Sequence, residues 1–223
     1  MTAIFAYAND DIAFIAADSR RTEGSRSFMV EKVHRWSETV LLAQTGAGRP
    51  MTRLIQKMMF NRDHDYPKNS TGEGLKSLYS SLRPLLYNEE LRTSRSRSAL
   101  NGTFVVVVAS DGIAPAEIFT LDYATGAYTP IGGSGTRYAD GTNQTVFQAV
   151  ADRQFAALSS SASKLPLDVW ASNCIQDAVA SEPQHVDWPA DLAISRFFPG
   201  SGRRFILRRI ASPITSGIVD FLY

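Results

Sequence analysis

The chain has 223 residues and nearly balanced charges, with 23 lysine and arginine residues against 22 aspartate and glutamate residues. Its hydrophobic fraction of 44% and charged fraction of 20% exclude extended disorder and collagen-like repeats. The charge balance argues against a dedicated nucleic-acid binder, no apolar run is long enough to span a membrane, and a secretory signal pattern is lacking. We therefore expect a single domain over residues 1–223 that is cytoplasmic and has no nucleic-acid or membrane partner.

Cysteine and histidine are too sparse to build a metal centre. Cys174 is the single cysteine of the sequence, which excludes an internal disulfide and a multi-cysteine metal site. The three histidines, His34, His64 and His185, are scattered without metal-ligand spacing. We expect no metal or organic cofactor.

The first half of the chain reads as short strands followed by two helices. Short apolar runs predict buried strands at residues 3–8, 12–17 and 40–43. Apolar side chains then repeat at helical spacing over residues 51–59 and 75–82, and Pro84 is expected to bend or end the second helix. The polar stretch between them, residues 61–74, is predicted to be a loop.

The second half repeats this order. Strands are predicted at residues 104–109, 116–122 and 127–131. A glycine-rich segment, residues 132–135, is expected to open a second helical pair. The apolar spacing indicates a helix at 147–158, and Pro166 is expected to start a second helix that runs to about residue 180. A loop at 181–189 and a hairpin of strands 192–197 and 203–210 complete the chain.

Pairs of helices between groups of strands disfavour a doubly wound parallel sheet. The strands should instead pair mainly as antiparallel neighbours, with a helix pair covering each outer face. The predicted fold is α+β, a four-layer αββα sandwich.

Thr2 is the first candidate for chemistry. The initiator methionine is generally removed when the next side chain is small, and removal of Met1 would leave an α-amine and a hydroxyl on one residue. An α-amine has a pKa of about 7.7–8.0, so it can accept the hydroxyl proton near neutral pH. A threonine paired with its own amine is a recognised activated nucleophile.

Asp18 and Lys32 are candidates to support Thr2. Asp18 ends the second predicted strand, which should pair with the strand that begins after Thr2, and Lys32 precedes another apolar segment. A carboxylate beside a buried lysine would keep the lysine charged, and that charge would lower the proton affinity of the Thr2 amine and hydroxyl. Taken singly, Asp18 also fits a turn residue and Lys32 a surface residue.

Five segments occur in an order that resembles a known family: Thr2-Ala-Ile, Ala-Ala-Asp18-Ser-Arg, Lys32-Val, Thr-Gly46-Ala-Gly and Gly-Ser134-Gly. They resemble the proteasome β-subunit and HslV family of N-terminal nucleophile hydrolases, and within it the bacterial proteasome homologue branch. The resemblance covers about residues 2–200. It implies the four-layer sandwich, a catalytic Thr2, and Asp18 and Lys32 as the acidic and lysine members of the site.

The same resemblance implies roles for three further positions. Gly46 would supply the backbone N–H of an oxyanion hole, with Gly48 as the rival. Ser134 would bond near the threonine amine, although it also fits a helix N-cap. Asp187 matches the family's acidic residue after the last helix. Asp191 is the alternative to Asp187, and Ala190 would stand at the position of the hydroxyl residue in the family pattern.

The sequence therefore predicts a threonine endopeptidase that hydrolyses unfolded proteins or peptides. The resemblance further implies a homo-oligomer of two stacked rings, with seven subunits per ring favoured over six, and an ATPase unfoldase as a possible partner. Two alternatives stay open. One is a catalytically weak scaffold or peptide-binding shell of the same fold, and the other is a small-molecule amidase of the wider N-terminal nucleophile class.

Overall fold

The structure is a computed structural model that describes residues 2–23, 26–46, 48–94, 100–112, 114–159 and 166–213. Two five-stranded sheets form its centre, and every pairing within them is antiparallel. The first sheet contains β1 (Ala3–Ala8), β2 (Ile12–Asp18), β10 (Thr136–Gly141), β11 (Ala190–Phe198) and β12 (Gly202–Ile210), in the order β10–β1–β2–β11–β12.

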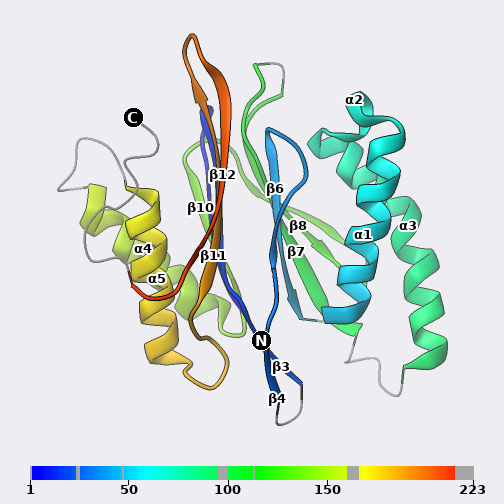
Figure 1. Ribbon diagram of the computed structural model, residues 1–223, viewed down its shortest axis with the longest axis horizontal. Helices are drawn as coiled ribbons and strands as arrows, with labels where there is room; N and C mark the ends of the chain where they lie inside the picture. Colours follow the sequence, from blue (N-terminus) through cyan, green and yellow to red (C-terminus); the bar gives the residue numbers. More distant parts are fainter. Residues whose placement is uncertain are drawn as a thin grey trace.

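The second sheet contains β5 (Val33–Arg35), β6 (Val40–Gly46), β7 (Gly102–Val108), β8 (Glu117–Asp122) and β9 (Tyr128–Gly132), which pair in chain order. A separate two-stranded ribbon, β3 (Arg20–Glu23) with β4 (Arg26–Met29), extends below the two sheets at the end where the chain begins (Figure 1).

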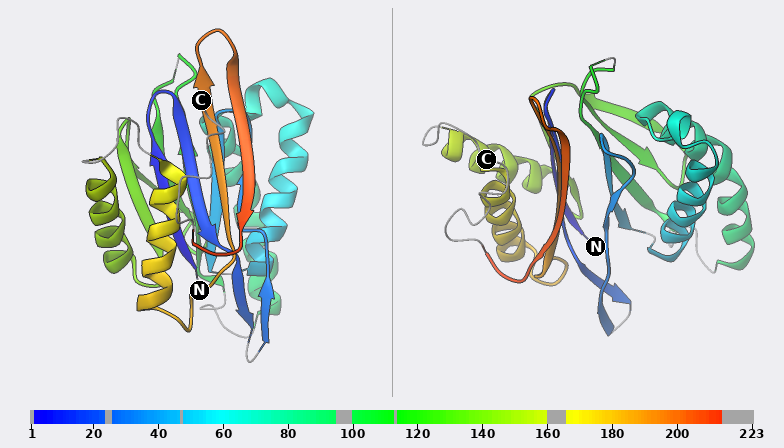
Figure 2. Two further views of the ribbon diagram at one scale, coloured as in Figure 1. Left: turned by 60° about the vertical axis from the view of Figure 1, so that its left-hand side comes forward. Right: turned by 45° about the horizontal axis from the view of Figure 1, so that its top comes forward.

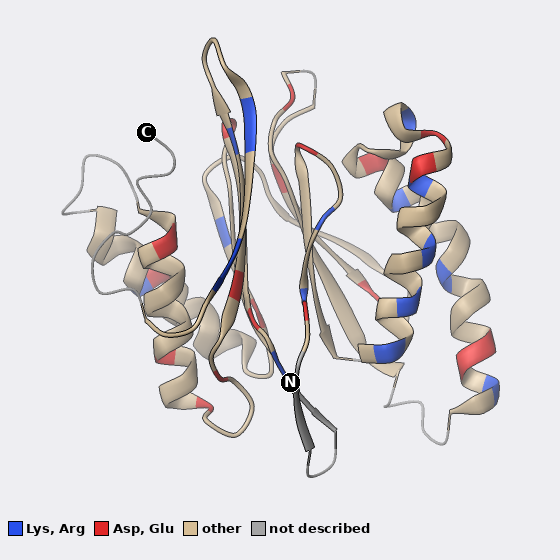
Figure 3. Cartoon of the chain, in the orientation of Figure 1, with Lys and Arg blue, Asp and Glu red and all other residues tan. Residues whose placement is uncertain are grey.

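Helices cover both outer faces and complete four layers (Figure 1). The second sheet is covered by α1 (Gly48–His64), α2 (Tyr66–Asn69) and α3 (Gly72–Thr93), and the first sheet by α4 (Gln144–Ser159) and α5 (Leu167–Ser181). The two further views in Figure 2 show the same sequence of helices, sheet, sheet and helices. Charged residues of both signs occur on the helices of both outer layers (Figure 3).

Three hydrophobic clusters hold the layers together. One lies between α4–α5 and the first sheet around Trp170, and a second lies between α1–α3 and the second sheet around Trp36. The third lies between the two sheets and is rich in alanines, including Ala6, Ala13 and Ala17. Small side chains let the sheets approach closely, which brings the strand ends of the two sheets into one region.

Several local predictions were wrong. The segment 61–74 is not a continuous loop, because α1 runs on to His64 and α2 follows it. The helix α3 does not end at Pro84, because it continues to Thr93. The glycine-rich segment 132–135 leads into strand β10 before α4 begins. Each error placed an element boundary on a single Gly, Pro or polar signal.

Among the described residues no helix is long and apolar enough to cross a membrane. Cys174 is buried in the cluster beneath α5, where it packs as a small apolar side chain.

Candidate active site

Thr2 lies at one end of the sandwich, where β1 begins beside the ends of β2 and β10. It is buried, with 4% of its surface exposed. Its carbonyl oxygen accepts a hydrogen bond from the backbone N–H of Thr142 at 3.4 Å. Gly141 pairs with Ala3, and a Cβ placed on Gly141 would lie 1.9 Å from the Thr2 carbonyl oxygen. Only a glycine at position 141 therefore permits β10 to pass this close to Thr2.

Asp18 connects the strand carrying Thr2 to Lys32. Its Oδ1 accepts a hydrogen bond of 2.8 Å from the backbone N–H of Ala3, the residue after Thr2. Its Oδ2 lies 3.1 Å from the Nζ of Lys32. Asp18 is fully buried and Lys32 is 4% exposed, so the pair is shielded from water. Sequence reasoning placed these two residues together, and the structure does bring them together.

Burial and charge act in opposite directions on this pair. Burial raises the pKa of the Asp18 carboxyl, while the Lys32 ammonium and the Ala3 N–H both oppose that rise by stabilising the carboxylate. Lys32 also donates a hydrogen bond to the carbonyl oxygen of Arg20. The lysine ammonium is thus fixed by one carboxylate and one carbonyl group within two residues of the end of β2.

Gly46 lies on the other sheet but is tied to the same region. The backbone N–H of Gln44 donates to the carbonyl oxygen of Lys32 at 3.1 Å, and Gly46 ends β6 two residues later. Gly46 has a φ of +81°, and a Cβ there would meet the carbonyl oxygen of Asn101 at 2.3 Å. The rival, Gly48, is the first residue of α1. The N-terminus of α1 therefore opens toward this end of the sandwich, where free N–H groups and the helix dipole favour negative charge.

Ser134 is not at this end, which corrects the expectation that it bonds near the threonine amine. The N–H of its neighbour Gly135 donates to the carbonyl oxygen of Ala8, and Ala8 is at the opposite end of β1 from Thr2. The glycine-rich segment was expected to lead directly into a helix, but β10 intervenes and moves Ser134 away by the length of a strand.

Thr142 holds the place expected for Ser134, at the turn between β10 and α4. Thr142 was not predicted as a site residue, because the alternating residues 136–141 were not recognised as a strand. That alternation, with Tyr138 and Asp140 on one face and Ala139 on the other, was the available signal.

Asp187 and Asp191 occupy different surroundings. Asp187 is half-exposed and pairs with Arg20 at 3.4 Å. Asp191 is 4% exposed and accepts two hydrogen bonds from Arg209, at 2.6 and 2.9 Å. Neither carboxylate has a described contact with Thr2. The segment between them is nevertheless anchored near the site, because the N–H and hydroxyl of Ser19 both donate to the carbonyl oxygen of Pro189.

His34 lies close to Asp191 and gives stability a pH dependence. Its Nε2 is buried and has no hydrogen-bond partner among the described residues. Burial lowers the pKa of His34 to about 4, although the charge of Asp191 opposes the shift. The folded chain therefore keeps His34 neutral over a pH range in which the unfolded chain protonates it.

We expect the free energy of unfolding to fall as pH decreases from about 6.5 to about 4, because only the unfolded chain takes up a proton at His34 in this window. The contribution is at most about 3 kcal/mol. Urea unfolding at pH 7 and pH 4 should show a larger loss for the wild type than for His34→Gln. Equal losses in the two proteins would contradict this role of His34.

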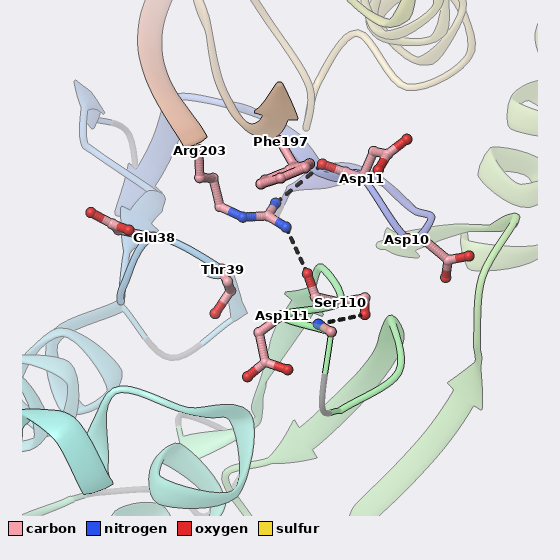
Figure 4. A pocket seen from close by; sticks show the side chains of 9 residues that line it. Asp10, Asp11, Glu38, Thr39, Ser110, Asp111, Phe197 and Arg203 are labelled. Carbon is pink, nitrogen blue, oxygen red and sulfur yellow. Dashed lines mark hydrogen bonds between the residues drawn. The ribbon is translucent and has the colours of Figure 1, made fainter. Parts of the chain in front are cut away.

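A cavity of about 500 Å³ lies at the other end of the sandwich (Figure 4). Its lining includes Asp10, Glu38, Asp111 and Arg203. Arg203 donates hydrogen bonds to the carbonyl oxygens of Asp11 and Ser110, at 3.1 and 2.6 Å. None of the residues predicted for catalysis lines this cavity.

The two antiparallel sheets between helix layers form a four-layer sandwich with the proteasome-related, N-terminal nucleophile hydrolase-like fold. The predicted fold class is confirmed. Two solved structures share it. Anbu (ancestral beta-subunit) from Yersinia bercovieri matches with a TM-score of 0.68 over 95% of this chain and 88% of that chain, at 13% identity. The Anbu (Gly-1) mutant from Hyphomicrobium sp. strain MC1 matches with a TM-score of 0.64 over 95% and 87%, also at 13% identity.

These matches correct the family assignment made from the motifs. The similar structures are Anbu proteins, which are proteasome-like but form a distinct family, so the assignment to the proteasome β-subunit and HslV family is contradicted. No family model matches the sequence, and no curated protein sequence matches it. At 13% identity the likeness is one of fold.

Proposed function

We propose that the chain is a threonine-type endopeptidase, with Thr2 as the nucleophile after removal of Met1. The observation that carries the proposal is the buried bridge from the Ala3 N–H through Asp18 to Lys32, which places a fixed positive charge beside the start of β1. The Thr2 hydroxyl is a weak nucleophile, so it needs a nearby positive charge that lowers its pKa and a neighbouring base that accepts its proton. The freed α-amine is that base.

The first half of the reaction forms an ester. The Thr2 hydroxyl transfers its proton to the Thr2 α-amine, and the Oγ attacks the carbonyl carbon of the scissile peptide bond. Lys32 stabilises the oxygen as it loses the proton, and Asp18 keeps Lys32 charged. N–H groups at the junction of β6 and α1, with Gly46 first among them, hydrogen-bond the oxyanion of the tetrahedral intermediate. The C–N bond then breaks, and the leaving amine takes the proton from the α-ammonium.

The second half restores the enzyme. Water attacks the ester carbonyl and gives a proton to the α-amine, a second tetrahedral intermediate forms, and the C–O bond to Thr2 breaks as the Oγ regains a proton. Apart from the substrate and water, the groups that take part in these steps belong to the chain itself. The protein's contribution is the orientation and electrostatics of Thr2, Lys32 and the N–H donors.

The substrates in this proposal are unfolded proteins or peptides, which reach sites inside a closed assembly of identical subunits. Two stacked rings of seven subunits are favoured over rings of six, and an ATPase unfoldase is a possible partner. The name of one similar structure describes it as a beta-subunit, which supports assembly. Native mass spectrometry distinguishes the cases, because a monomer or dimer with an open site favours a small-molecule amidase.

Hydrolysis of a fluorogenic peptide panel tests the proposed activity. The chain is prepared with Thr2 as its first residue, and wild type is compared with Thr2→Ala and Thr2→Ser. We expect Thr2→Ala to lose hydrolysis and Thr2→Ser to retain part of it, because serine keeps a hydroxyl beside the amine. Equal rates for wild type and Thr2→Ala would remove the proposed mechanism.

One observation favours a second candidate, a shell of the same fold that binds peptides without efficient cleavage. Ser134 and Asp187, which were expected near the Thr2 amine, have their described contacts elsewhere. Peptide binding by wild type and Thr2→Ala alike, with no hydrolysis by either, would favour the shell.

A further inference from the structure

Asp140 is a half-buried residue of β10 with one buried carboxylate oxygen, and the proposed mechanism does not use it. It pairs with Ile4 of β1, and two residues away Tyr138 pairs with Ala6. Ile4, Ala6 and Tyr138 all belong to the cluster between the two sheets, so Asp140 lies on the face of the first sheet that looks toward the second. Alternation along β1 places Thr2 on this same face.

The two oxygens of the Asp140 carboxylate differ in their hydrogen bonding. Its Oδ1 accepts a hydrogen bond of 2.8 Å from the N–H of Gly141, but its Oδ2 is buried and has no hydrogen-bond partner among the described residues. Burial accordingly raises the pKa of Asp140, and only the Gly141 N–H opposes the shift. A buried acceptor left unpaired destabilises the folded chain, so a donor is expected to reach this oxygen in the functional form of the chain.

Removal of Met1 creates a donor on the correct side of β1. The N–H and C=O groups of one strand residue point to the same neighbour, and the carbonyl group of Thr2 accepts from Thr142 at the end of β10. The N–H of Ala3 points the other way, to Asp18. The nitrogen of Thr2 therefore faces β10. Diagonal neighbours such as Thr2 and Asp140 have Cα atoms roughly 7–8 Å apart, which a carboxylate spans directly or through one water.

We propose that Asp140 is a positioning residue that accepts a hydrogen bond from the α-amine of Thr2 in the trimmed chain. The inference rests on the proposed function for its catalytic meaning. The carboxylate orients the amine lone pair with respect to the Thr2 hydroxyl, and its negative charge balances the effect of Lys32 on the amine. Without that balance, Lys32 alone would keep the amine a weaker base.

Several titratable groups lie on the described elements that pack near Asp140, and each has partners of its own. On its own strand Tyr138 accepts a hydrogen bond from Gln144 of α4 and stays neutral, because burial and the neighbouring Asp140 raise its pKa. On the facing sheet Asp122 ends β8, where its Oδ1 accepts hydrogen bonds from Thr125. The Asp18–Lys32 pair lies beyond Thr2 on the β2 side, and Asp152 of α4 pairs with Arg137. The Thr2 amine is therefore the donor that the trimmed chain places next to Asp140.

The pKa of the Thr2 amine tests this role without relying on catalysis. The chain is released from a cleavable fusion so that Thr2 is its first residue, and the amine is titrated by competitive acetylation with trace acetic anhydride, read by peptide mass spectrometry. We expect the amine pKa to be about one unit lower in Asp140→Asn than in wild type, because a neighbouring negative charge is lost. Asp152→Asn, which removes a carboxylate from the α4 surface, should leave it unchanged.

The acidic limb of the kcat/KM profile should move in the same direction, to lower pH, in Asp140→Asn. Asp140→Ser is a second uncharged variant if the amide fails to fold. An amine pKa that is the same in wild type and the uncharged variant overturns the role of Asp140. A shifted amine pKa without peptide hydrolysis supports the role of Asp140 and contradicts the proposed function. Thr2-dependent hydrolysis without a shift of the amine pKa supports the proposed function and contradicts the role of Asp140.

Discussion

Lys32→Met should reduce kcat/KM for peptide hydrolysis by about 10²–10³-fold, as expected for removal of one preorganised electrostatic contact at a reacting oxygen. It should also lower the free energy of unfolding by about 3–5 kcal/mol, because Asp18 is left buried without its partner. Urea unfolding and steady-state kinetics measure the two effects. The loss of stability should shrink as the pH is lowered, because burial raises the pKa of Asp18 and the variant lacks the Lys32 charge that opposes this rise.

A double variant separates the two roles of Lys32. In Asp18→Asn with Lys32→Met, neither position carries a charge and the amide oxygen can still accept from the Ala3 N–H. Much of the lost stability should therefore return, while activity stays low. Recovery of activity together with stability would show that Lys32 serves the fold alone.

Gly141→Ala should destabilise the chain by about 3 kcal/mol or more. Gly141 has a φ of +138°, and its new Cβ would collide with the carbonyl oxygen of Thr2, which is backbone and cannot rotate away. The end of β10 would have to separate from β1 and lose the Thr142 to Thr2 hydrogen bond. Because this displaces Thr2, peptide hydrolysis should fall as well.

Gly135→Ala is the matched control. Gly135 also has a positive φ, +83°, and lies in the connection before β10, but a Cβ there meets nothing within 4 Å. Its substitution should cost only about 1–2 kcal/mol, the intrinsic penalty of a left-handed conformation. Chemical denaturation of both variants gives the comparison. Equal losses of stability would show that contact with Thr2 does not restrict residue 141.

The sequence was most informative where residue patterns reflect burial on both faces of a sheet. The continuous apolar runs of β1, β2 and β7 and the helical stripes of α1 and α4 follow directly from the layered core, so the sandwich could be predicted. Thr2, Asp18 and Lys32 could be associated because strand pairing places the start of β1 beside the end of β2.

The rest of the site depends on register, which the sequence patterns did not reveal. Ser134 and Thr142 are both hydroxyl residues near a helix start, and only the presence of β10 decides which of them meets Thr2. Asp187 and Asp191 are four positions apart in the sequence. Only tertiary packing decides that Asp187 pairs with Arg20 and that Asp191 is buried against Arg209. Short motifs also gave the wrong family, since similar local sequences serve the same layered fold in distinct proteins.

The state of the chain's first residue tests the central claim most directly. The intact mass of the natively expressed protein is measured before and after treatment with a peptide epoxyketone, a reagent that requires a free amine and a hydroxyl on the same residue. We predict a mass lacking Met1, and one adduct per chain that maps to Thr2 and is absent from Thr2→Ala. Retention of Met1, or an untouched Thr2 in the trimmed chain, would contradict a threonine nucleophile.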